Sequence, residues 1–265
     1  SMKELLFKHI TSVREQAPLV QNITNYVVMN NTANALLAVG ASPIMAHAHP
    51  EMQSMQAICQ ALVINIGTLD EYWVESMKLA VAAANQNNKP WILDPVGAGA
   101  TAYRDEVLSE LLALKPTAIR GNASEILALA KHNTTATKGV DSTSSSLEAI
   151  EAAQFLNKEY GALVVISGAV DIVVSEESVD QLKNGDALMT KITGMGCSAT
   201  AILAAFIAVI PNKKEAALAA TSLMAVAGEL AAKSSQGPGS LQMHLLDKLH
   251  SITKEEYINT VKILD

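Results

Sequence analysis

Short apolar runs alternate with longer stretches of helical periodicity along much of the chain. Apolar runs closed by turn residues are typical of buried strands, and strands that alternate with helices favour a parallel sheet with right-handed crossovers. The runs predicted as strands are 43–48, 61–67, 90–97, 116–122 and 161–168. The stretches predicted as helices are 26–40, 71–87, 103–114, 123–131 and 146–159. The pattern therefore predicts an α/β fold whose central sheet is mostly parallel.

Three segments depart from this alternation. Residues 171–190 resemble a hairpin of antiparallel strands at a sheet edge, and the chain from Cys197 onward is nearly all helical in pattern. The Thr-, Ser- and Gly-rich stretch 132–146 is predicted to be a loop between helices, or a mobile flap. Because no internal repeat or break in composition is visible, residues 1–265 are predicted to form a single domain.

Composition and charge limit the classes of function. The chain has 265 residues, 49% of them apolar but only 4% aromatic, so its core must be mainly aliphatic. A net charge of −7 without a basic stripe argues against a nucleic-acid partner. Two cysteines fit a reducing, cytoplasmic location. The longest uncharged apolar run, 197–210, is shorter than the roughly 20 residues of a membrane helix, so no membrane association is expected.

Polar residues follow the predicted strands at the points where the strands end. The pairs Gly67–Thr68, Asp94–Pro95 and Ser167–Gly168 close three runs, and Arg120–Asn122 closes a fourth. The carboxyl ends of parallel strands share one edge of a sheet, and ligands bind in the crevice outside that edge. Four polar strand ends in register therefore predict a binding site there.

Two acids near this edge are candidates for binding a metal. Asp94 and Glu125 could hold Mg²⁺ through its waters, beside Arg120 and Asn122 as phosphate ligands. Acids without His or Cys companions suit Mg²⁺ rather than Zn²⁺. The alternatives are structural: Asp94 caps a turn, and Glu125 occupies a helix first turn, where the dipole favours an acid.

The glycines of "DPVGAGATA" match a dinucleotide-binding pattern, G-x-G-x-x-A, at Gly97, Gly99 and Ala102. A dinucleotide fold would place these glycines directly after a strand, with an acid about 20 residues further on. Asp94–Pro95 interrupts the strand before them, and the next strand ends in Arg120. The pattern therefore favours a functional Asp94 over a dinucleotide site.

The stretch "TGMGCSAT", residues 193–200, places a glycine-rich turn before an apolar helix. Free N–H groups at a helix start bind anions, so Gly194 to Cys197 are predicted to cradle a phosphate. The chain has no P-loop motif that would offer another cradle. Cys197 is a nucleophile, a base or a small buried side chain. The helix start lowers the pKa of a thiol, whereas an arriving phosphate raises it, and the sequence leaves the balance open.

The sequence closely resembles the hydroxyethylthiazole kinases of thiamine salvage, a family of the ribokinase-like superfamily. The resemblance runs in order over nearly the whole chain. It rests on "PLVQNITNYVVMNNTANALLAVGASPIMAHA", "DPVGAGAT", "RGNASEI" and "TGMGCSATA", of which the first and last are specific to this family. One departure is Leu241 after "GPGS", where the family pattern has an aromatic residue. This change affects helix packing rather than chemistry.

The resemblance implies a fold, a reaction and an assembly. The fold is a ribokinase-like three-layer sandwich with no separate lid domain. The reaction is ATP- and Mg²⁺-dependent phosphorylation of the primary alcohol of 4-methyl-5-(2-hydroxyethyl)thiazole. The assembly is a homotrimer with its sites near subunit interfaces.

The resemblance also implies roles for particular residues. Met45 and Gly194 contact the thiazole, with Asn25 and Gly67 as neighbours. Arg120, Asn122 and Ser167 bind ATP, while Asp94 and Glu125 organise Mg²⁺. Cys197 occupies the place where the superfamily commonly has an aspartate base. With Gly194 and Gly196 it serves as base or as part of the anion hole.

Three other functions stay open on the sequence. Hydroxymethylpyrimidine kinase is another small-alcohol kinase of the same superfamily and pathway. A nucleotide-dependent NAD(P)H-hydrate dehydratase has the same fold but releases water, and the segment from Asn22 to Met45 argues against it. A non-catalytic ATP sensor would keep the phosphate cradle without turnover.

Overall fold

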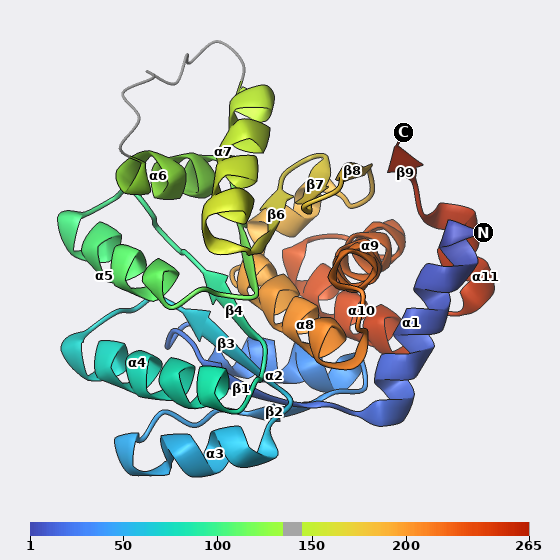
Figure 1. The fold of residues 1–265 in the computed structure, drawn as a ribbon. Helices are drawn as coiled ribbons and strands as arrows, with labels where there is room; N and C mark the ends of the chain where they lie inside the picture. The colour runs from blue at the N-terminus through green and yellow to red at the C-terminus, as the bar shows by residue number, and fades with distance from the viewer. Residues whose placement is uncertain (135–144, 265) are drawn as a thin grey trace.

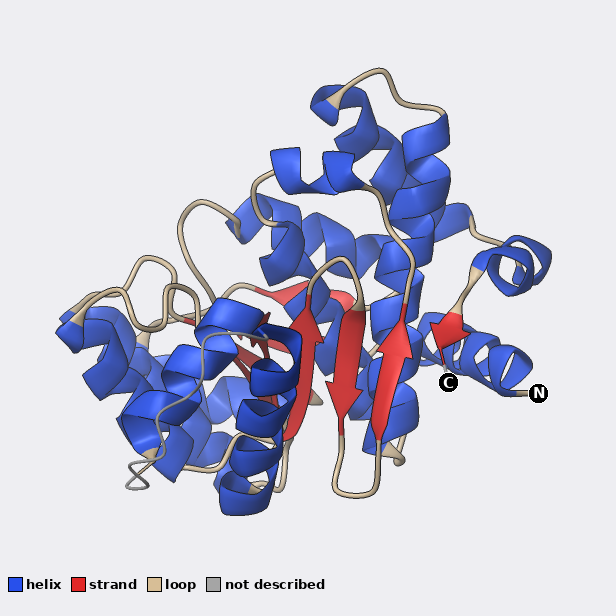
Figure 2. Ribbon diagram, turned by 90° about the horizontal axis from the view of Figure 1, so that it is seen from above, coloured by secondary structure: helices blue, strands red, loops and turns tan. Residues whose placement is uncertain are grey.

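A nine-stranded sheet runs through the described part of the protein and separates two layers of helices (Figure 1). The structure is a computed structural model that describes residues 1–134 and 145–264. The strand order is β2-β1-β3-β4-β5-β6-β7-β8-β9. Strands from β2 to β6 pair in parallel, whereas β7, β8 and β9 are antiparallel to their neighbours (Figure 2). The predicted α/β class with a mostly parallel sheet is therefore confirmed.

The strands are β1 (Leu19–Ile23), β2 (Ser42–Ile44), β3 (Ala61–Asn65), β4 (Trp91–Asp94), β5 (Ala118–Asn122), β6 (Leu163–Ser167), β7 (Asp171–Val174), β8 (Val179–Leu182) and β9 (Ile263–Leu264). The α-helices are α1 (Met2–Gln16), α2 (Met29–Ala38), α3 (Met52–Ile58), α4 (Glu71–Gln86), α5 (Ala102–Ala113), α6 (Ala123–Asn133), α7 (Ser145–Tyr160), α8 (Met195–Val209), α9 (Lys213–Lys233), α10 (Pro238–Ser251) and α11 (Lys254–Thr260). Two short 3₁₀ helices are η1 (His49–Glu51) and η2 (Ala187–Lys191).

The central strands β1, β3, β4 and β6 are buried on both faces along nearly all of their length, in keeping with the apolar runs of β3, β4 and β6. Successive side chains point to opposite faces of a strand, so Val63 packs in one core while Leu62 and Ile64 pack in the other. Helices α1, α2, α8, α9, α10 and α11 cover the first face, and α3 to α7 cover the second (Figure 1). Leu241 of α10 is fully buried in the first core, so this departure from the family pattern is accommodated in helix packing.

Several element boundaries differ from the prediction. β4 ends at Asp94 because Pro95 cannot supply a ladder N–H, and β2 ends at Ile44 instead of residue 48. The hairpin is confirmed as β7 and β8, but η2 follows it where more strand was expected. The predicted loop 132–146 lies largely outside the described residues; α6 extends to Asn133 and α7 begins at Ser145.

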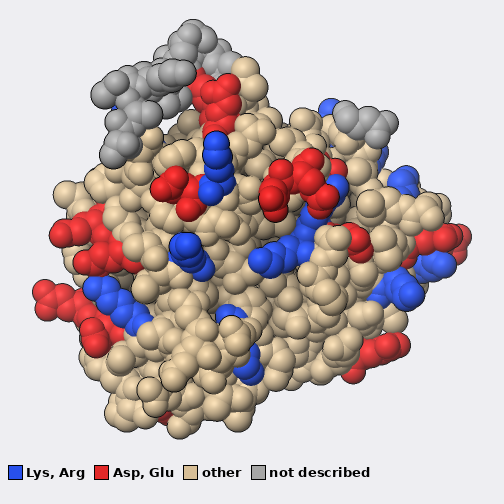
Figure 3. All heavy atoms as spheres, in the orientation of Figure 1, with Lys and Arg blue, Asp and Glu red and all other residues tan. Residues whose placement is uncertain are grey.

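One described helix, α9, has the length and mean hydropathy of a membrane span, but 78% of its most apolar window is buried within the protein. This burial is that of a core helix, consistent with its place between α8 and α10. On the face drawn in Figure 3, acidic and basic side chains are interspersed rather than gathered by sign.

Candidate active site

The carboxyl ends of the six parallel strands bring the predicted site residues to one edge of the sheet. Strand pairing aligns Ile23 with Ile64, Asn65 with Asp94, and Asn122 with Ser167. Following the strand order from β2 to β6, the residues at or just beyond this edge are Met45, Asn25, Gly67, Asp94, Arg120, Asn122 and Ser167. Helix α8 packs on β1, β3 and β4, so its N-terminus with Gly194, Gly196 and Cys197 closes the same region.

Asp94 is the most buried charged side chain of this edge, with 4% of its surface exposed. Its Oδ2 accepts a 2.8 Å hydrogen bond from Thr200 Oγ1 in α8. Burial raises the pKa of Asp94 to about 7; Thr200 and the Arg120 charge oppose this rise, and the Glu125 carboxylate adds to it. A buried acid with a pKa near neutrality is poised to gain or lose a proton, or to exchange it for a cation.

Glu125 begins α6 with a capping box. Its Oε1 accepts from the Asn122 backbone N–H at 2.9 Å, and the Asn122 side chain accepts from the Glu125 N–H at 2.8 Å. Its other oxygen accepts from the Gly97 N–H at 2.9 Å, which ties the turn after Asp94 to α6. Glu125 therefore has a structural role at the start of α6, as the alternative to metal binding predicted. The same contacts hold Asp94 and Glu125 close to each other.

The donor set fits a cation bound mainly through water and phosphate. Among residues 1–134 and 145–264, no group of three or more His, Cys, Asp or Glu side chains could form a complete cage. Asp94 and Glu125 provide two oxygen-bearing groups, and Mg²⁺ commonly binds through one or two carboxylates while keeping several waters. The pair therefore fits Mg²⁺ beside a nucleotide rather than a dedicated all-protein metal site.

Replacing Glu125 with glutamine should weaken the fold and the metal dependence together. The glutamine amide can accept only one of the two backbone hydrogen bonds, so the free energy of unfolding should fall by about 1 kcal/mol in a urea titration. The Mg²⁺ concentration needed for half-maximal activity should rise. Glu256 has the same capping box with Thr253 on α11, so Glu256→Gln is the matched control. If both variants shift the Mg²⁺ titration equally, Glu125 has no part in binding the cation.

Cys197 lies in the first turn of α8, partly buried, with amide groups around its sulfur. Asn25 Nδ2 donates to Sγ at 3.6 Å. Burial raises the pKa of the thiol to about 11; the nearby Asp94 adds to the rise, whereas Asn65, Asn25 and Arg120 oppose it. The sequence left the balance of effects on this pKa open; in the structure, burial of the thiol and the nearby Asp94 raise it.

Asn65 links three of the predicted residues, although it was not itself among the predicted site residues. Its Oδ1 accepts from Asn25 Nδ2 and from the Gly67 N–H, each at 2.9 Å. Its Nδ2 is buried without a hydrogen bond of good geometry among the described residues, and lies close enough to Cys197 to lower the pKa of the thiol. A polar residue at the end of an otherwise apolar strand was the only available signal.

At two positions near Cys197, Gly67 and Gly194, neighbouring side chains leave no room for a Cβ atom. A Cβ added at Gly67 would lie 2.5 Å from Asn25 Nδ2, and one at Gly194 would lie 2.8 Å from Val28 Cγ1. Gly194 also has φ 83°, in the left-handed region that favours glycine, as the N-cap of α8. No side chain caps α8, so its first amides have neither an intrahelical partner nor a side-chain acceptor.

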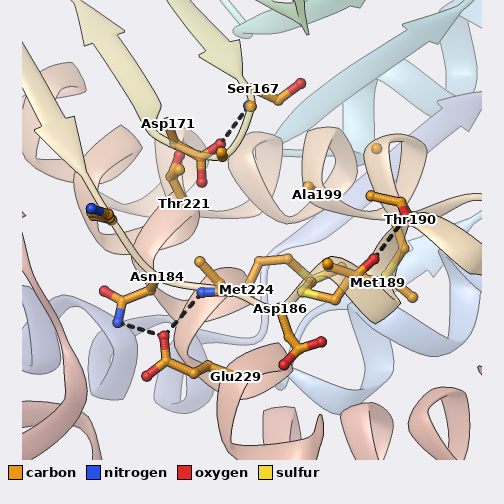
Figure 4. Close-up of a pocket in the computed structure, with 18 of the residues that line it drawn as sticks. Ser167, Asp171, Asn184, Asp186, Met189, Thr190, Ala199, Thr221, Met224 and Glu229 are labelled. Atoms are coloured by element: carbon orange, nitrogen blue, oxygen red, sulfur yellow. Dashed lines mark hydrogen bonds between the residues drawn. The ribbon is translucent and has the colours of Figure 1, made fainter. Parts of the chain in front are cut away.

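A cleft of about 740 Å³ begins at the Arg120 end of this edge. Its lining includes the polar residues Arg120, Asn122, Ser167, Asp171, Asn184, Asp186 and Glu229 and an apolar wall of Met189, Met195, Ala199, Met224 and Ala225. Figure 4 shows Met189, Ala199 and Met224 with Ser167 and Asp171 on one side and Asn184 and Glu229 on another. Arg120 Nη1 donates to the Gly196 carbonyl at 3.2 Å, which joins the strand side of the cleft to α8. An apolar inner wall beside an arginine suits a molecule with a flat base and a phosphate chain.

The predicted residues thus fall into two groups. Arg120, Asn122, Ser167 and Gly196 line the cleft. Asn25, Gly67 and Cys197 gather around Asn65, outside the cleft lining. Asp94 lies between the groups, since Arg120 and Cys197 both interact with it electrostatically. Met45 follows the edge strand β2, at the far end of the row from the cleft.

Comparisons with known proteins show which family the chain resembles. The model of the hydroxyethylthiazole kinase family matches residues 10–255. Hydroxyethylthiazole kinase of Vibrio parahaemolyticus is 53% identical over 98% of each chain, and that of Syntrophus aciditrophicus is 51% identical over 96% of this chain and 95% of its own.

Solved structures agree with the sequence comparisons. A hydroxyethylthiazole kinase protein from Pyrococcus horikoshii is 39% identical over 98% of each chain, with a TM-score of 0.91. Pyridoxal kinase from Staphylococcus aureus, at 18% identity over 80% of this chain and 87% of its own, has a TM-score of 0.62 and shows a likeness of fold alone.

Proposed function

The chain belongs to the hydroxyethylthiazole kinase family, and we propose that it phosphorylates the primary alcohol of 4-methyl-5-(2-hydroxyethyl)thiazole at the carboxyl edge of its sheet. The main observation that supports this location for the site is that the carboxyl ends of β1, β3, β4, β5 and β6 lie in a row along one edge of the sheet. On one side of Asp94 lies the cleft that Arg120, Asn122 and Ser167 line, and on the other side lies the uncharged cluster of Asn25, Asn65, Gly67 and Cys197. A neutral heteroaromatic alcohol needs apolar contact and a few hydrogen bonds that orient it, and Met45, Asn25 and Gly67 would supply these.

ATP is assigned to the cleft. Its base would lie against the apolar inner wall, and its phosphates would extend past Ser167 and Arg120 toward the start of α8. The unpartnered first amides of α8 would take the transferring phosphoryl group, because they point positive charge at one position. Gly194 and Gly196 keep that approach free of side chains.

Asp94 and Glu125 would hold Mg²⁺ through its waters, and bound Mg²⁺ would neutralise charge on the phosphate oxygens. The contribution of the protein is to set these acids in place. Thr200 fixes Asp94, and two backbone N–H groups fix Glu125. The hydrogen bond of Arg120 to the Gly196 carbonyl would keep its guanidinium beside the same phosphates.

Cys197 would lie nearest the attacking alcohol. A thiol whose pKa is raised to about 11 is protonated at neutral pH, so Cys197 is a weak base at rest, whereas a carboxylate in its place would already be in its basic form. The amides of Asn25 and Asn65 keep its sulfur in a fixed place. A covalent phosphocysteine is unnecessary, because direct in-line transfer needs no such intermediate.

A homotrimer with sites near its interfaces is part of the same proposal. Tyr26, Val27 and Tyr72 are 60%, 61% and 46% exposed, and they flank the Asn25 and Gly67 side of the edge. Large exposed apolar side chains beside a site support an interface there. Light scattering on the purified protein would give the mass of the assembly.

Release of ADP by the purified protein tests the proposed reaction. With ATP and Mg²⁺, ADP should form when the thiazole alcohol is added and should saturate with its concentration. The hydroxymethylpyrimidine alcohol is the matched control, and it should give little ADP. Faster turnover of the pyrimidine would transfer the assignment to the other kinase, and no alcohol-dependent ADP at all would favour a non-catalytic nucleotide sensor.

A further inference from the structure

Arg104 joins two loops of the active-site edge through its guanidinium group. Its Nη1 donates to the carbonyl oxygens of Ile66 at 2.6 Å and Val96 at 3.0 Å, and its Nη2 donates to that of Gly67 at 2.8 Å. Ile66 and Gly67 follow β3, and Val96 follows β4. A single side chain thus connects the loop after β3, which contains Gly67, to the turn directly after Asp94.

The position of Arg104 makes these contacts unusual. It lies in the first turn of α5, where the helix dipole disfavours a cation. Among the described residues, no carboxylate lies within ion-pair distance of its guanidinium. The charge is instead directed at three backbone carbonyls, an arrangement that suits the planar fork of arginine and not the single ammonium of lysine.

The backbone around Arg104 is fixed as well. Thr101 Oγ1 accepts from the Arg104 N–H at 3.1 Å, and Asp105 Oδ1 accepts from the Gly99 N–H at 2.8 Å. Asp105 therefore holds the segment from Pro95 to Ala100 at one further point, Gly99, and Thr101 caps the helical turn that carries Arg104. The guanidinium extends from an anchored base rather than from a free loop.

We propose that Arg104 is a positioning residue that sets the distance between the bound alcohol and the Asp94 side of the site. This inference rests on the proposed function, because it takes Gly67 as part of the alcohol site and Asp94 as part of the metal site. Phosphoryl transfer depends mainly on alignment of the reacting groups. A clamp between these two loops would control that alignment without touching either substrate.

If Arg104 sets the distance between these two loops, its substitution should have a specific kinetic effect. Arg104→Lys keeps the charge and the stem but cannot bridge three carbonyls. Its kcat should fall by about 10- to 100-fold, since a misplacement on the order of 1 Å has effects of this size. The KM for the alcohol should rise because the Gly67 carbonyl is released. The KM for ATP should stay unchanged, because the cleft residues lie on or beside β5, β6, η2, α8 and α9, whereas Arg104 is hydrogen-bonded to the loops after β3 and β4.

Arg14 provides the matched control. Its guanidinium also donates to two backbone carbonyls, those of Leu249 at 3.5 Å and Ile252 at 3.1 Å, but it lies on α1, away from the sheet edge. Arg14→Lys should lower the melting temperature and leave kcat per folded molecule unchanged. The folded fraction of each variant is measured by near-UV circular dichroism in the assay buffer.

Arg104→Gln is the second variant, and its amide can still donate to one loop. The proposal is supported if both Arg104 variants lose kcat per folded molecule while Arg14→Lys does not. It is overturned if the Arg104 variants match Arg14→Lys in kinetics, or if neither folds, because the residue would then act on stability alone. Wild-type turnover of the alcohol is measured in the same series, so a failure of the proposed function appears in the wild-type protein first.

Discussion

Asp94→Asn is expected to lower kcat by about 10²- to 10³-fold while making the folded protein more stable above neutral pH. The loss of activity follows because asparagine is a poor ligand for Mg²⁺ and carries no charge. The gain in stability follows because Asp94 is 4% exposed, so folding must remove a carboxylate from water. Asparagine retains an oxygen that can accept the hydrogen bond from Thr200.

The pH dependence of this gain has a definite sign. The pKa of Asp94 is raised from 3.8 to about 7 on folding, so folding favours the protonated form. The contribution of Asp94 to stability is fully present below pH 3.8 and is lost as the pH rises through about 7. The difference in melting temperature between Asp94→Asn and wild type should therefore widen across this window, in thermal unfolding without Mg²⁺.

Asp105→Asn is the control for this experiment, since Asp105 accepts from Gly99 on the same loop and lies outside the proposed metal site. It should keep most of the wild-type kcat. An Asp94→Asn variant that is less stable than wild type at pH 8 would contradict the burial argument. A variant with normal activity and an unchanged Mg²⁺ titration would remove Asp94 from the metal site.

Cys197→Asp is expected to keep substantial kinase activity, whereas Cys197→Ala should lower kcat by about 10- to 100-fold with a smaller rise in KM. The donors Asn25 Nδ2 and Asn65 Nδ2 surround the sulfur and could instead donate to a carboxylate. Alanine would remove the sulfur that accepts from Asn25 Nδ2 and lies beside the buried Asn65 Nδ2, so Asn25 Nδ2 would keep only Asn65 Oδ1 as its acceptor. An introduced acid would be repelled by Asp94, and Arg120 would offset part of that repulsion.

The two outcomes separate the possible roles of the thiol. An Asp variant that is folded and binds ATP but is inactive would exclude a proton-accepting role at this position. Cys59→Ala is the control, because Cys59 is fully buried just beyond α3 and away from the site. It should leave kcat unchanged, whatever its effect on stability.

Periodicity predicted the layered fold because the central strands are buried on both faces and end in turn residues. β1 was missed as a separate element because its Gln21 and Asn22 interrupt the apolar run, although both side chains are buried and hydrogen-bonded in the structure. β9 is only two residues long and depends on pairing with β8, which is distant in sequence. Local pattern carries no information on such a pairing.

The site was predictable where it follows from strand ends and from a glycine-rich helix start. Asp94, Arg120 and Ser167 lie at the same edge because parallel strands end together. Asn65, Thr200 and Arg104 were not predictable, because each acts through a tertiary contact with a residue far along the chain. The raised pKa of Cys197 likewise depends on its burial beside Asp94, which the helix start alone does not reveal.

Phosphorus NMR of a single reaction mixture tests the central claim most directly. Purified protein, ATP, Mg²⁺ and the thiazole alcohol should give a phosphomonoester signal that grows as the ATP γ-phosphate signal declines, in equal amounts. Asp94→Asn under the same conditions should give almost none. Growth of inorganic phosphate in place of the ester, or an ATP signal that does not decline when the alcohol is added, would contradict the assignment of this edge as a thiazole alcohol kinase site.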